Sequence, residues 1–331
     1  MSSPAIAPDD TLAAPEARPA GPRPRVPRRP VHGVLLLDKP LGLSSNDALQ
    51  KVKRLFRAEK AGHTGTLDPL ATGLLPICFG AATKFSQASL EADKGYRALV
   101  RLGQTRVGGD GEGEIVAERP VQVSPEGLQV AVARFVGEID QIPPMQSAIK
   151  KDGKALYEYA RAGVEIERPP RRITIHRLDI VAWDPAQLLL TLDVRCSKGT
   201  YVRTLAEDLG EALGCGAHLA GLVRTGSGRL DVADAVSLEA LEAMDEPARD
   251  KLLRGPDCML GDWPTVLLDA KESGRFITGL KRRVALPDAP AVRVYGPNPA
   301  VFLGSASIAS GELIPDRLLS PDEVQALILN Q

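Results

Sequence analysis

The sequence predicts an α+β fold with a smaller β-rich domain at its C-terminal end. Strand-like and helix-like segments are mixed, without the regular alternation of a doubly wound sheet. The 331 residues exceed what a single hydrophobic core usually serves. From about residue 263 the chain becomes strand-like and rich in turns, notably at 292–295 and 300–303. We therefore expect one domain over residues 31–262 and a second over residues 263–331.

The first domain divides into elements by its apolar periodicity and its turn residues. The apolar run after Gly33 predicts a buried strand, Ser44 or Ser45 can cap the helix that follows, and Ser124-Pro125 is a typical helix start. The expected strands are 33–38, 74–80, 95–102, 114–119, 172–183 and 187–195, and the expected helices are 46–57, 81–90, 124–136, 155–162 and 200–213. We expect a loop at 61–73, a Gly-rich turn at 103–113, and a region of helix and loop at 237–262 that leads out of the first domain.

The N-terminal segment and the overall composition limit the classes of function. Residues 1–30 contain eight prolines and five arginines but no apolar run, so we expect a disordered tail, no secretory signal and a cytoplasmic protein. The formal net charge of -1 argues against coating nucleic acid through bulk charge, although a basic patch on one face would suffice for RNA. The four cysteines form no CxxC pair, so neither a zinc site nor a disulfide framework is indicated.

The most unusual segment is the loop Gly62-His-Thr-Gly-Thr-Leu-Asp-Pro-Leu-Ala-Thr-Gly73. It places one carboxylate, Asp68, among glycines and hydroxyl groups. Because Asp-Pro often starts a turn, the residues alone leave a purely structural role open. The loop lacks the patterns of a phosphate-binding loop, a zinc deaminase and a nucleophile elbow. A lone carboxylate without metal ligands can still act as a nucleophile or as a general base.

Several long motifs, in the same order and over about residues 33 to 230, resemble the TruB-type tRNA pseudouridine-55 synthases. Besides the loop at 62–73, they are Gly33-Val-Leu-Leu-Leu-Asp-Lys-Pro-Leu-Gly-Leu-Ser-Ser45, Ala82-Thr-Lys-Phe85, Asp93-Lys-Gly-Tyr-Arg97, Pro143-Pro-Met-Gln-Ser-Ala-Ile-Lys150, Cys196-Ser-Lys-Gly-Thr-Tyr-Val-Arg203 and Cys215-Gly-Ala-His218. The resemblance implies the pseudouridine synthase fold, with a mixed, largely antiparallel sheet.

The resemblance also implies a reaction and its residues. Asp68 would be the nucleophile, attacking either C1′ of the ribose or C6 of the uracil, and neither a cofactor nor a metal would be needed. Arg203 would keep the pKa of Asp68 low and hold the carboxylate in place. Tyr96 would stack on the flipped uracil and handle a proton.

Further residues would hold the RNA. His63 matches a histidine that fills the gap left by the flipped base, and Leu222 matches a leucine that packs against the base. Two basic stretches, from Lys94 to Arg106 and over an insertion at 150–172, favour phosphate contacts. The RNA-binding residues that we expect are His63, Lys39, Tyr201, Leu222, Lys150 and Arg161; for Lys39, the alternatives are ordering the active site or a surface position.

One segment departs from the usual family frame Gly-x-x-Thr-x-Thr-x-Asp-x-x-Gly. Here Arg106 and Gly108 occupy the two threonine positions, while Asp110 and the flanking glycines are kept. Thr105 could replace one hydroxyl by a shift of one residue. We expect a more flexible loop with altered substrate contacts, in which Asp110 orders the loop.

The second domain resembles, more weakly, the PUA-like appendage of the family, which would grip the end of the acceptor stem; a β module that only packs on the first domain is the alternative. The expected partner is the T arm of tRNA, and we expect a monomer with no obligatory protein partner. Two other functions stay open: a tRNA-folding chaperone with dispensable catalysis, and a guide-dependent pseudouridylase of the dyskerin type.

Overall fold

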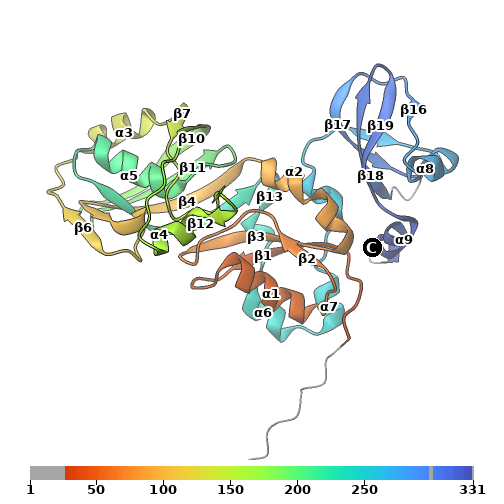
Figure 1. The fold of residues 1–331 in the computed structure, drawn as a ribbon, viewed down its shortest axis with the longest axis horizontal. Helices are drawn as coiled ribbons and strands as arrows, with labels where there is room; N and C mark the ends of the chain where they lie inside the picture. Colours follow the sequence, from red (N-terminus) through yellow and green to blue (C-terminus); the bar gives the residue numbers. More distant parts are fainter. Residues whose placement is uncertain (1–26, 298–300, 330–331) are drawn as a thin grey trace, which may run out of the picture.

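The computed structural model describes residues 27–297 and 301–329, which form two sheets with their flanking helices (Figure 1). Most of the tail expected at residues 1–30 lies outside the described residues. The smaller sheet stands apart from the larger one in Figure 1, as the sequence predicts for the second domain. None of the helices in the described ranges is long and apolar enough to cross a membrane.

The large sheet is mixed and largely antiparallel, as predicted. Only two of its pairings, β1 with β14 and β3 with β12, are parallel. In spatial order its strands are β14 (Val236–Ser237), β1 (Gly33–Lys39), β3 (Ala71–Phe79), β12 (Ala217–Ser227), β4 (Lys94–Leu102), β11 (Leu189–Cys196), β10 (Arg171–Asp184) and β7 (Gly137–Gln141), with β2 (Ala61–His63) beside β3 and β13 (Leu230–Asp231) beside β12. Two hairpins lie outside it: β5 (Gln104–Arg106) with β6 (Ile115–Glu118), and β8 (Lys150–Lys151) with β9 (Lys154–Ala155).

Helices cover the sheet in two groups, and each group encloses its own core. The first core lies between β4, β10, β11 and β12 and the helices α3 and α5. The second lies between β1, β3 and the helices α1 and α6. The helices of the large domain are α1 (Ser45–Leu55), α2 (Ser86–Glu91), α3 (Pro125–Ala133), α4 (Leu156–Arg161), α5 (Val202–Ala212), α6 (Leu238–Ala243) and α7 (Glu246–Asp250), with 3-10 turns η1 (Gly80–Phe85), η2 (Val107–Gly109), η3 (Val232–Asp234) and η4 (Pro256–Met259). Tyr96 and Leu222 pack against both cores, so the centre of the sheet joins them.

The structure departs from the predicted elements at several places. The region expected to be irregular at 61–73 contains the short strand β2 and the start of β3. The helix expected at 81–90 is a 3-10 turn followed by α2. The central strand β12 was not predicted, because Gly221, Gly226 and its polar residues weaken the strand pattern. The edge strand β7 was also missed, directly after the helix predicted at 124–136.

The C-terminal sheet has five strands and packs on the large domain through a mixed core. Its strands, in spatial order, are β15 (Thr265–Leu267), β17 (Ala289–Tyr295), β18 (Phe302–Ala309), β19 (Glu312–Leu318) and β16 (Arg282–Arg283), with helices α8 (Ala270–Phe276) and α9 (Pro321–Leu329). The strands expected at 300–303 and around Ile308 are one strand, β18, of which residue 300 lies outside the described ranges. Phe302 meets Phe85 of the large domain edge-on, with ring centroids 5.1 Å apart.

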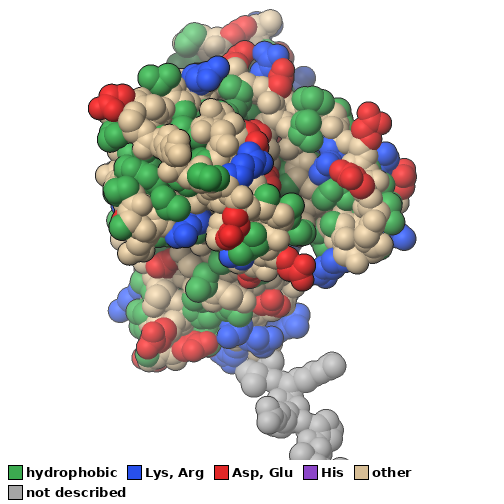
Figure 2. Space-filling model, turned by 90° about the vertical axis from the view of Figure 1, so that its left-hand side faces the viewer, with side chains coloured by type: hydrophobic (Ala, Val, Ile, Leu, Met, Phe, Trp, Pro, Cys, Tyr) green, Lys and Arg blue, Asp and Glu red, His purple; other side chains and the backbone are tan. Residues whose placement is uncertain are grey.

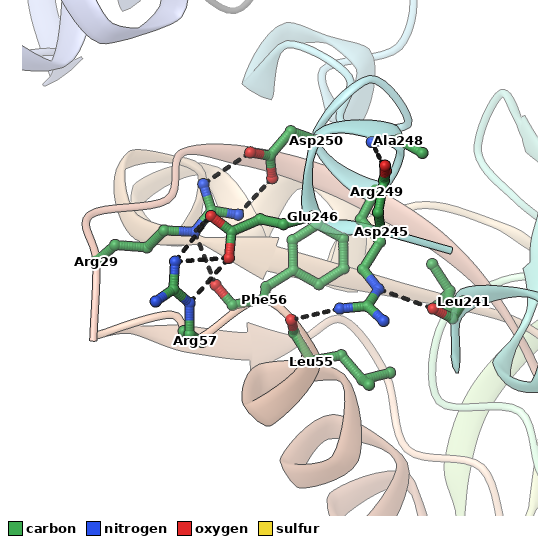
Figure 3. Close-up of polar contacts among 10 residues, drawn as sticks. All are labelled: Arg29, Leu55, Phe56, Arg57, Leu241, Asp245, Glu246, Ala248, Arg249 and Asp250. Atoms are coloured by element: carbon green, nitrogen blue, oxygen red, sulfur yellow. Dashed lines mark hydrogen bonds and ion pairs between the residues drawn. The ribbon is translucent and has the colours of Figure 1, made fainter. Parts of the chain in front are cut away.

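The chain just after the tail is fixed to α7 by a cluster of ion pairs (Figure 3). The Arg29 guanidinium donates to both carboxylate oxygens of Asp250 and, through Nε, to the carbonyl of Phe56. Arg57, at the end of α1, pairs with Glu246. The ordered part of the chain therefore extends at least to Arg29, slightly earlier than the boundary near residue 31 that the sequence suggested.

Candidate active site

The loop that carries Asp68 connects β2 to β3 and is fixed by bonds from α1 and α2. Ser45, the first residue of α1, accepts a hydrogen bond from Leu67 N at 2.7 Å and donates one to Leu67 O at 3.0 Å. The Ser89 hydroxyl donates to Thr64 Oγ1, and Thr64 is fully buried. These contacts hold the backbone immediately before the carboxylate, while the Asp68 side chain itself stays 44% exposed.

The carboxylate of Asp68 and the guanidinium of Arg203 form an ion pair, with Nη2 and Oδ2 2.9 Å apart. Arg203 lies in the first turn of α5 and is almost fully buried. Its other donors bond to the carbonyls of Gly108 at 3.2 Å and Gln146 at 2.7 Å, and the Asp110 carboxylate lies 3.8 Å from Nη1. The guanidinium thus has a fixed orientation and presents one edge to the carboxylate.

The pKa of Asp68 lies above its ordinary value, and this corrects the sequence-based expectation. Burial of the carboxyl group is the main cause, and the negative charge of Asp110 adds to it. Arg203 lowers the pKa as expected, and Lys39 does so as well, but together they do not offset the burial. The site therefore holds a carboxylate that is less solvated than a free one, which favours nucleophilic attack.

Tyr96 lies on β4, opposite Arg224 of β12 and Val194 of β11. Burial raises the pKa of its phenol, the nearby Asp68 carboxylate raises it further, and the Arg224 guanidinium acts in the opposite direction. The same strand pairing places the phenol at the junction of the two cores. Asp68 and Arg203 thus form an ion pair, and the Tyr96 phenol lies close enough to Asp68 for the carboxylate to raise its pKa; that the three act together stays a prediction.

Arg224 is a buried cation at this site to which the sequence assigned no role. It is 1% exposed. Its Nε donates to Leu74 O at 2.7 Å and its Nη2 to Gly65 O at 3.2 Å, so it ties the catalytic loop to β3 and β12. Burial lowers its pKa, and the Tyr96 phenol partly compensates. The signal in the sequence was an arginine at the end of Gly221-Leu-Val-Arg224, two residues after the leucine that was singled out.

Two lysines expected at the RNA surface are buried instead. Lys39 is fully buried, and its Nζ donates to Pro40 O at 2.9 Å and Leu43 O at 2.6 Å, which closes the turn after β1. Lys94 is 6% exposed and donates to Ser89 O and Ala92 O at the end of α2. Burial lowers the pKa of each lysine to about 8. The prediction that these lysines contact phosphates directly is therefore wrong for this structure. Of the alternatives considered for Lys39, ordering the neighbouring backbone is the one that fits.

The remaining RNA-binding candidates fall into two groups. His63, Leu222 and Tyr201 lie near the site and are half-buried. His63, at the end of β2, has a pKa lowered by burial and by Arg224, and its buried Nδ1 has no hydrogen-bond partner among the described residues. Leu222 pairs with Ala71 of β3. Tyr201 precedes α5, with its backbone held by the Gln141 side chain.

Lys150 and Arg161 lie farther out, on the insertion at 150–172. Lys150 is exposed on the β8–β9 hairpin, and Arg161 is exposed at the end of α4, where its guanidinium lies 5.4 Å from the ring centre of Tyr157. From the end of the molecule that carries α3 and α5, Figure 2 shows basic and acidic side chains interspersed with hydrophobic ones. This face therefore carries no continuous basic surface.

Within residues 27–297 and 301–329, no three His, Cys, Asp or Glu side chains are grouped so that they could hold a metal ion. The four cysteines are free, and Cys78, Cys196 and Cys215 are buried. The expectation that the reaction needs neither metal nor cofactor stays a prediction.

Comparison with solved structures defines the class of protein. A chain in the crystal structure of a Cbf5–Nop10–Gar1 complex matches with a TM-score of 0.68 at 23% sequence identity, covering 88% of this chain and 87% of that one. A chain in the structure of an H/ACA RNP bound to a substrate RNA containing 2′-deoxyuridine matches with a TM-score of 0.67 at 21% identity, over 88% and 86% of the two chains. The fold is that of the pseudouridine synthases.

Sequence comparison identifies the family. The model of the N-terminal domain of the TruB family pseudouridylate synthases matches residues 53–202, and that of the tRNA pseudouridylate synthase B C-terminal domain matches residues 203–260. A protein of Ralstonia pickettii (strain 12J) named tRNA pseudouridine synthase B is 59% identical over 310 residues, 90% of this chain and 98% of that protein. One of Verminephrobacter eiseniae (strain EF01-2) with the same name is 55% identical over 318 residues, 95% and 96% of the two chains. The chain belongs to the TruB family of pseudouridylate synthases.

Proposed function

We propose that this enzyme, a tRNA pseudouridine synthase, isomerises uridine 55 in the T loop of tRNA, with Asp68 as the nucleophile. The observation that carries the proposal is the ion pair between Asp68 and the buried Arg203. It holds a half-exposed carboxylate in a fixed direction at the end of a loop that α1 and α2 support. The resemblance of the motifs supports uridine 55 as the target position, and the names of the relatives support tRNA as the substrate.

The chemistry conserves all atoms of the uridine. The N1–C1′ bond breaks, the uracil turns within the site, C5 bonds to C1′, and the loss of the proton from C5 is balanced by the gain of a proton at N1. The Asp68 carboxylate attacks C1′ or C6 to start this sequence, and the bond it forms is broken again when C5 is joined. Arg203 orients the carboxylate and balances the charge that returns to it on release. No cofactor takes part in this scheme.

The base must leave its stack before the reaction, so the site needs a surface that accepts a flipped uracil. In the proposal, Tyr96 supplies the aromatic face and carries the proton from C5. Leu222, its neighbour at the junction of the two cores, packs against the base, and His63 occupies the space that the base vacates in the RNA. Lys150 and Arg161 contact phosphates of the T arm.

The test is the formation of pseudouridine in an unmodified T-arm hairpin, with the modified position mapped. Asp68→Asn is expected to bind the hairpin with an affinity close to that of the unaltered protein and to form no product. Asp179→Asn, on the exposed face of β10, is the matched control and should remain fully active. Product formation by Asp68→Asn at a comparable rate would show that the nucleophile is a different group.

The same experiment addresses the alternatives. One of the two similar solved chains comes from a complex named with two further proteins, Nop10 and Gar1, whereas the two sequence relatives are each named tRNA pseudouridine synthase B. A stand-alone enzyme acts on the bare hairpin, and a guide-dependent one does not. Rescue of tRNA folding by Asp68→Asn would reveal a chaperone function besides the catalytic one.

A further inference from the structure

The Gly-rich segment at 107–113 supplies two of the acceptors that surround the catalytic arginine. The carbonyl of Gly108 accepts a hydrogen bond from Arg203 Nη1 at 3.2 Å, and the Asp110 carboxylate lies 3.8 Å from the same nitrogen. Asp110 is 6% exposed. Because these acceptors fix the orientation of Arg203, any group that holds this segment also affects the Asp68 carboxylate.

Arg106 holds this segment by hydrogen bonds to its backbone carbonyls. Its Nη1 donates to Gly111 O at 3.2 Å and to Gly113 O at 3.0 Å, so one side chain bridges the carbonyls on either side of Glu112. Asp110 Oδ1 accepts from Glu112 N at 3.1 Å within the same span. No carboxylate of the described residues lies within 4.0 Å of the Arg106 nitrogens, so the guanidinium serves backbone carbonyls and not an ion pair.

A threonine hydroxyl at position 105 or 108 does not replace the bridge that Arg106 forms. Gly108 has a φ of 81°, and a Cβ there would lie 2.6 Å from the amide of Gln146, so a threonine does not fit. Thr105 pairs with Ala117 in the β5–β6 hairpin, and its Cγ2 faces Gly216. Both threonines of the usual family motif are thus absent here, and the Arg106 guanidinium holds the 107–113 segment by its hydrogen bonds to Gly111 O and Gly113 O.

We propose that Arg106 is a positioning residue for catalysis, which holds the 107–113 segment so that Gly108 and Asp110 orient Arg203 toward Asp68. This inference rests on the proposed function and adds a residue to it. Arg106 need not touch the RNA for this role. Its effect passes through Asp110 as well as Gly108, so its contribution should become smaller when the Asp110 carboxylate is absent.

A double-mutant cycle with Arg106→Met and Asp110→Asn tests this dependence. Single-turnover rate constants and dissociation constants are measured on the T-arm hairpin, and thermal unfolding shows that each variant is folded. Arg106→Met should lower the rate constant at least about tenfold, as expected for a small misplacement of reacting groups, with a dissociation constant within about twofold. The loss of rate caused by Arg106→Met should be clearly smaller in the Asp110→Asn background than in the unaltered protein. Arg106→Lys, which can reach a carbonyl with one nitrogen, should be intermediate.

Arg119→Met is the matched control. Arg119 is exposed next to β6 of the same hairpin and pairs with Glu211, so its removal deletes an equal charge without touching the segment. Its rate constant should be unchanged. Independent, multiplicative losses in the cycle would overturn the proposal, and so would a weaker binding of RNA by Arg106→Met at an unaltered rate constant. If the unaltered protein formed no pseudouridine at all, the proposed function itself would fail, which is a separate result.

Discussion

The guanidinium of Arg203 lies 2.9 Å from the carboxylate of Asp68 and 3.8 Å from that of Asp110, so one buried cation stands between two carboxylates. Arg203→Met would leave both acids without their partner and two backbone carbonyls without a donor. We expect a loss of about 2–4 kcal/mol in the free energy of unfolding, near the lower end for a buried pair because Asp68 is half-exposed.

Arg203→Lys separates charge from geometry at the same position. A lysine keeps the positive charge but cannot serve Asp68, Gly108 O and Gln146 O together. Its unfolding free energy in urea should fall less than that of Arg203→Met, while its single-turnover rate constant falls roughly 100-fold. A lysine variant as fast as the unaltered enzyme would mean that charge alone is needed.

The pH dependence of the rate should show the raised pKa of Asp68. The carboxyl group must be ionised to attack, so the rate rises as the pH increases through this pKa, and the midpoint should lie above the value of about 3.9 for a free aspartate. Asp110 contributes to the upward shift. Asp110→Asn should therefore move the acidic limb to lower pH, even though its plateau rate is reduced. A shift toward higher pH would contradict this electrostatic description.

The fold was largely predictable because apolar runs and helix caps mark most of its elements. The helix after Ser44 and the strand pair β10–β11 lie almost where the pattern put them. The central strand β12 was not found, because Gly221, Gly226 and its polar residues weaken the strand pattern. The missing strand also concealed Arg224, since only the register of β12 with β3 and β4 brings this side chain under the catalytic loop.

The ion pair between Asp68 and Arg203 was predictable from the motifs, but the pKa of the carboxyl group was not. The motifs predicted that Arg203 lies beside Asp68, and from this we expected a low pKa for the carboxyl group. The degree of burial, which outweighs the charge of the arginine, depends on packing between α1, α5 and the loop. Likewise, the sequence around Lys39 does not show whether this side chain is buried or exposed, because that depends on how the chain packs around the end of β1.

Arg224 should influence catalysis more than stability. A buried cation without a carboxylate partner among the described residues costs free energy, so removing its charge offsets part of the loss of the two hydrogen bonds to carbonyls. Arg224→Met should therefore change the unfolding free energy by less than about 2 kcal/mol, yet release Gly65 and the Tyr96 phenol and lower the rate constant roughly 100-fold. Because Arg224 lowers the pKa of Tyr96, any alkaline limb due to Tyr96 should move to higher pH. A rate that falls only in proportion to the folded fraction would assign Arg224 a structural role alone.

Lys39 should give a pH-dependent contribution to stability. Its pKa is about 8 in the folded protein and about 10.4 in an unfolded chain, so the unfolded state binds more protons between these values. The stability due to Lys39 therefore rises with pH across this window, by up to about 3 kcal/mol. The unfolding free energy of Lys39→Met should therefore decrease relative to that of the unaltered protein from pH 7.5 to pH 10, because only the unaltered protein gains stability from Lys39 over this range. Comparing the two proteins at each pH cancels the opposing titration of the buried cysteines.

The ion pair between Arg29 and Asp250 should stabilise the first domain modestly. Both side chains are about one-quarter to one-third exposed, so Asp250→Asn is expected to cost roughly 1 kcal/mol or less. Among the described residues, the ion pairs to α7 begin at Arg29, so a protein that lacks residues 1–26 retains them and should keep the melting temperature of the full chain. A deletion through Arg29 should lower the melting temperature as much as Asp250→Asn or slightly more, since the bond to Phe56 O is lost as well. If the shorter deletion already caused the full decrease, residues before 27 would stabilise the fold through contacts of their own, and Arg29 would not be the point at which the chain is attached.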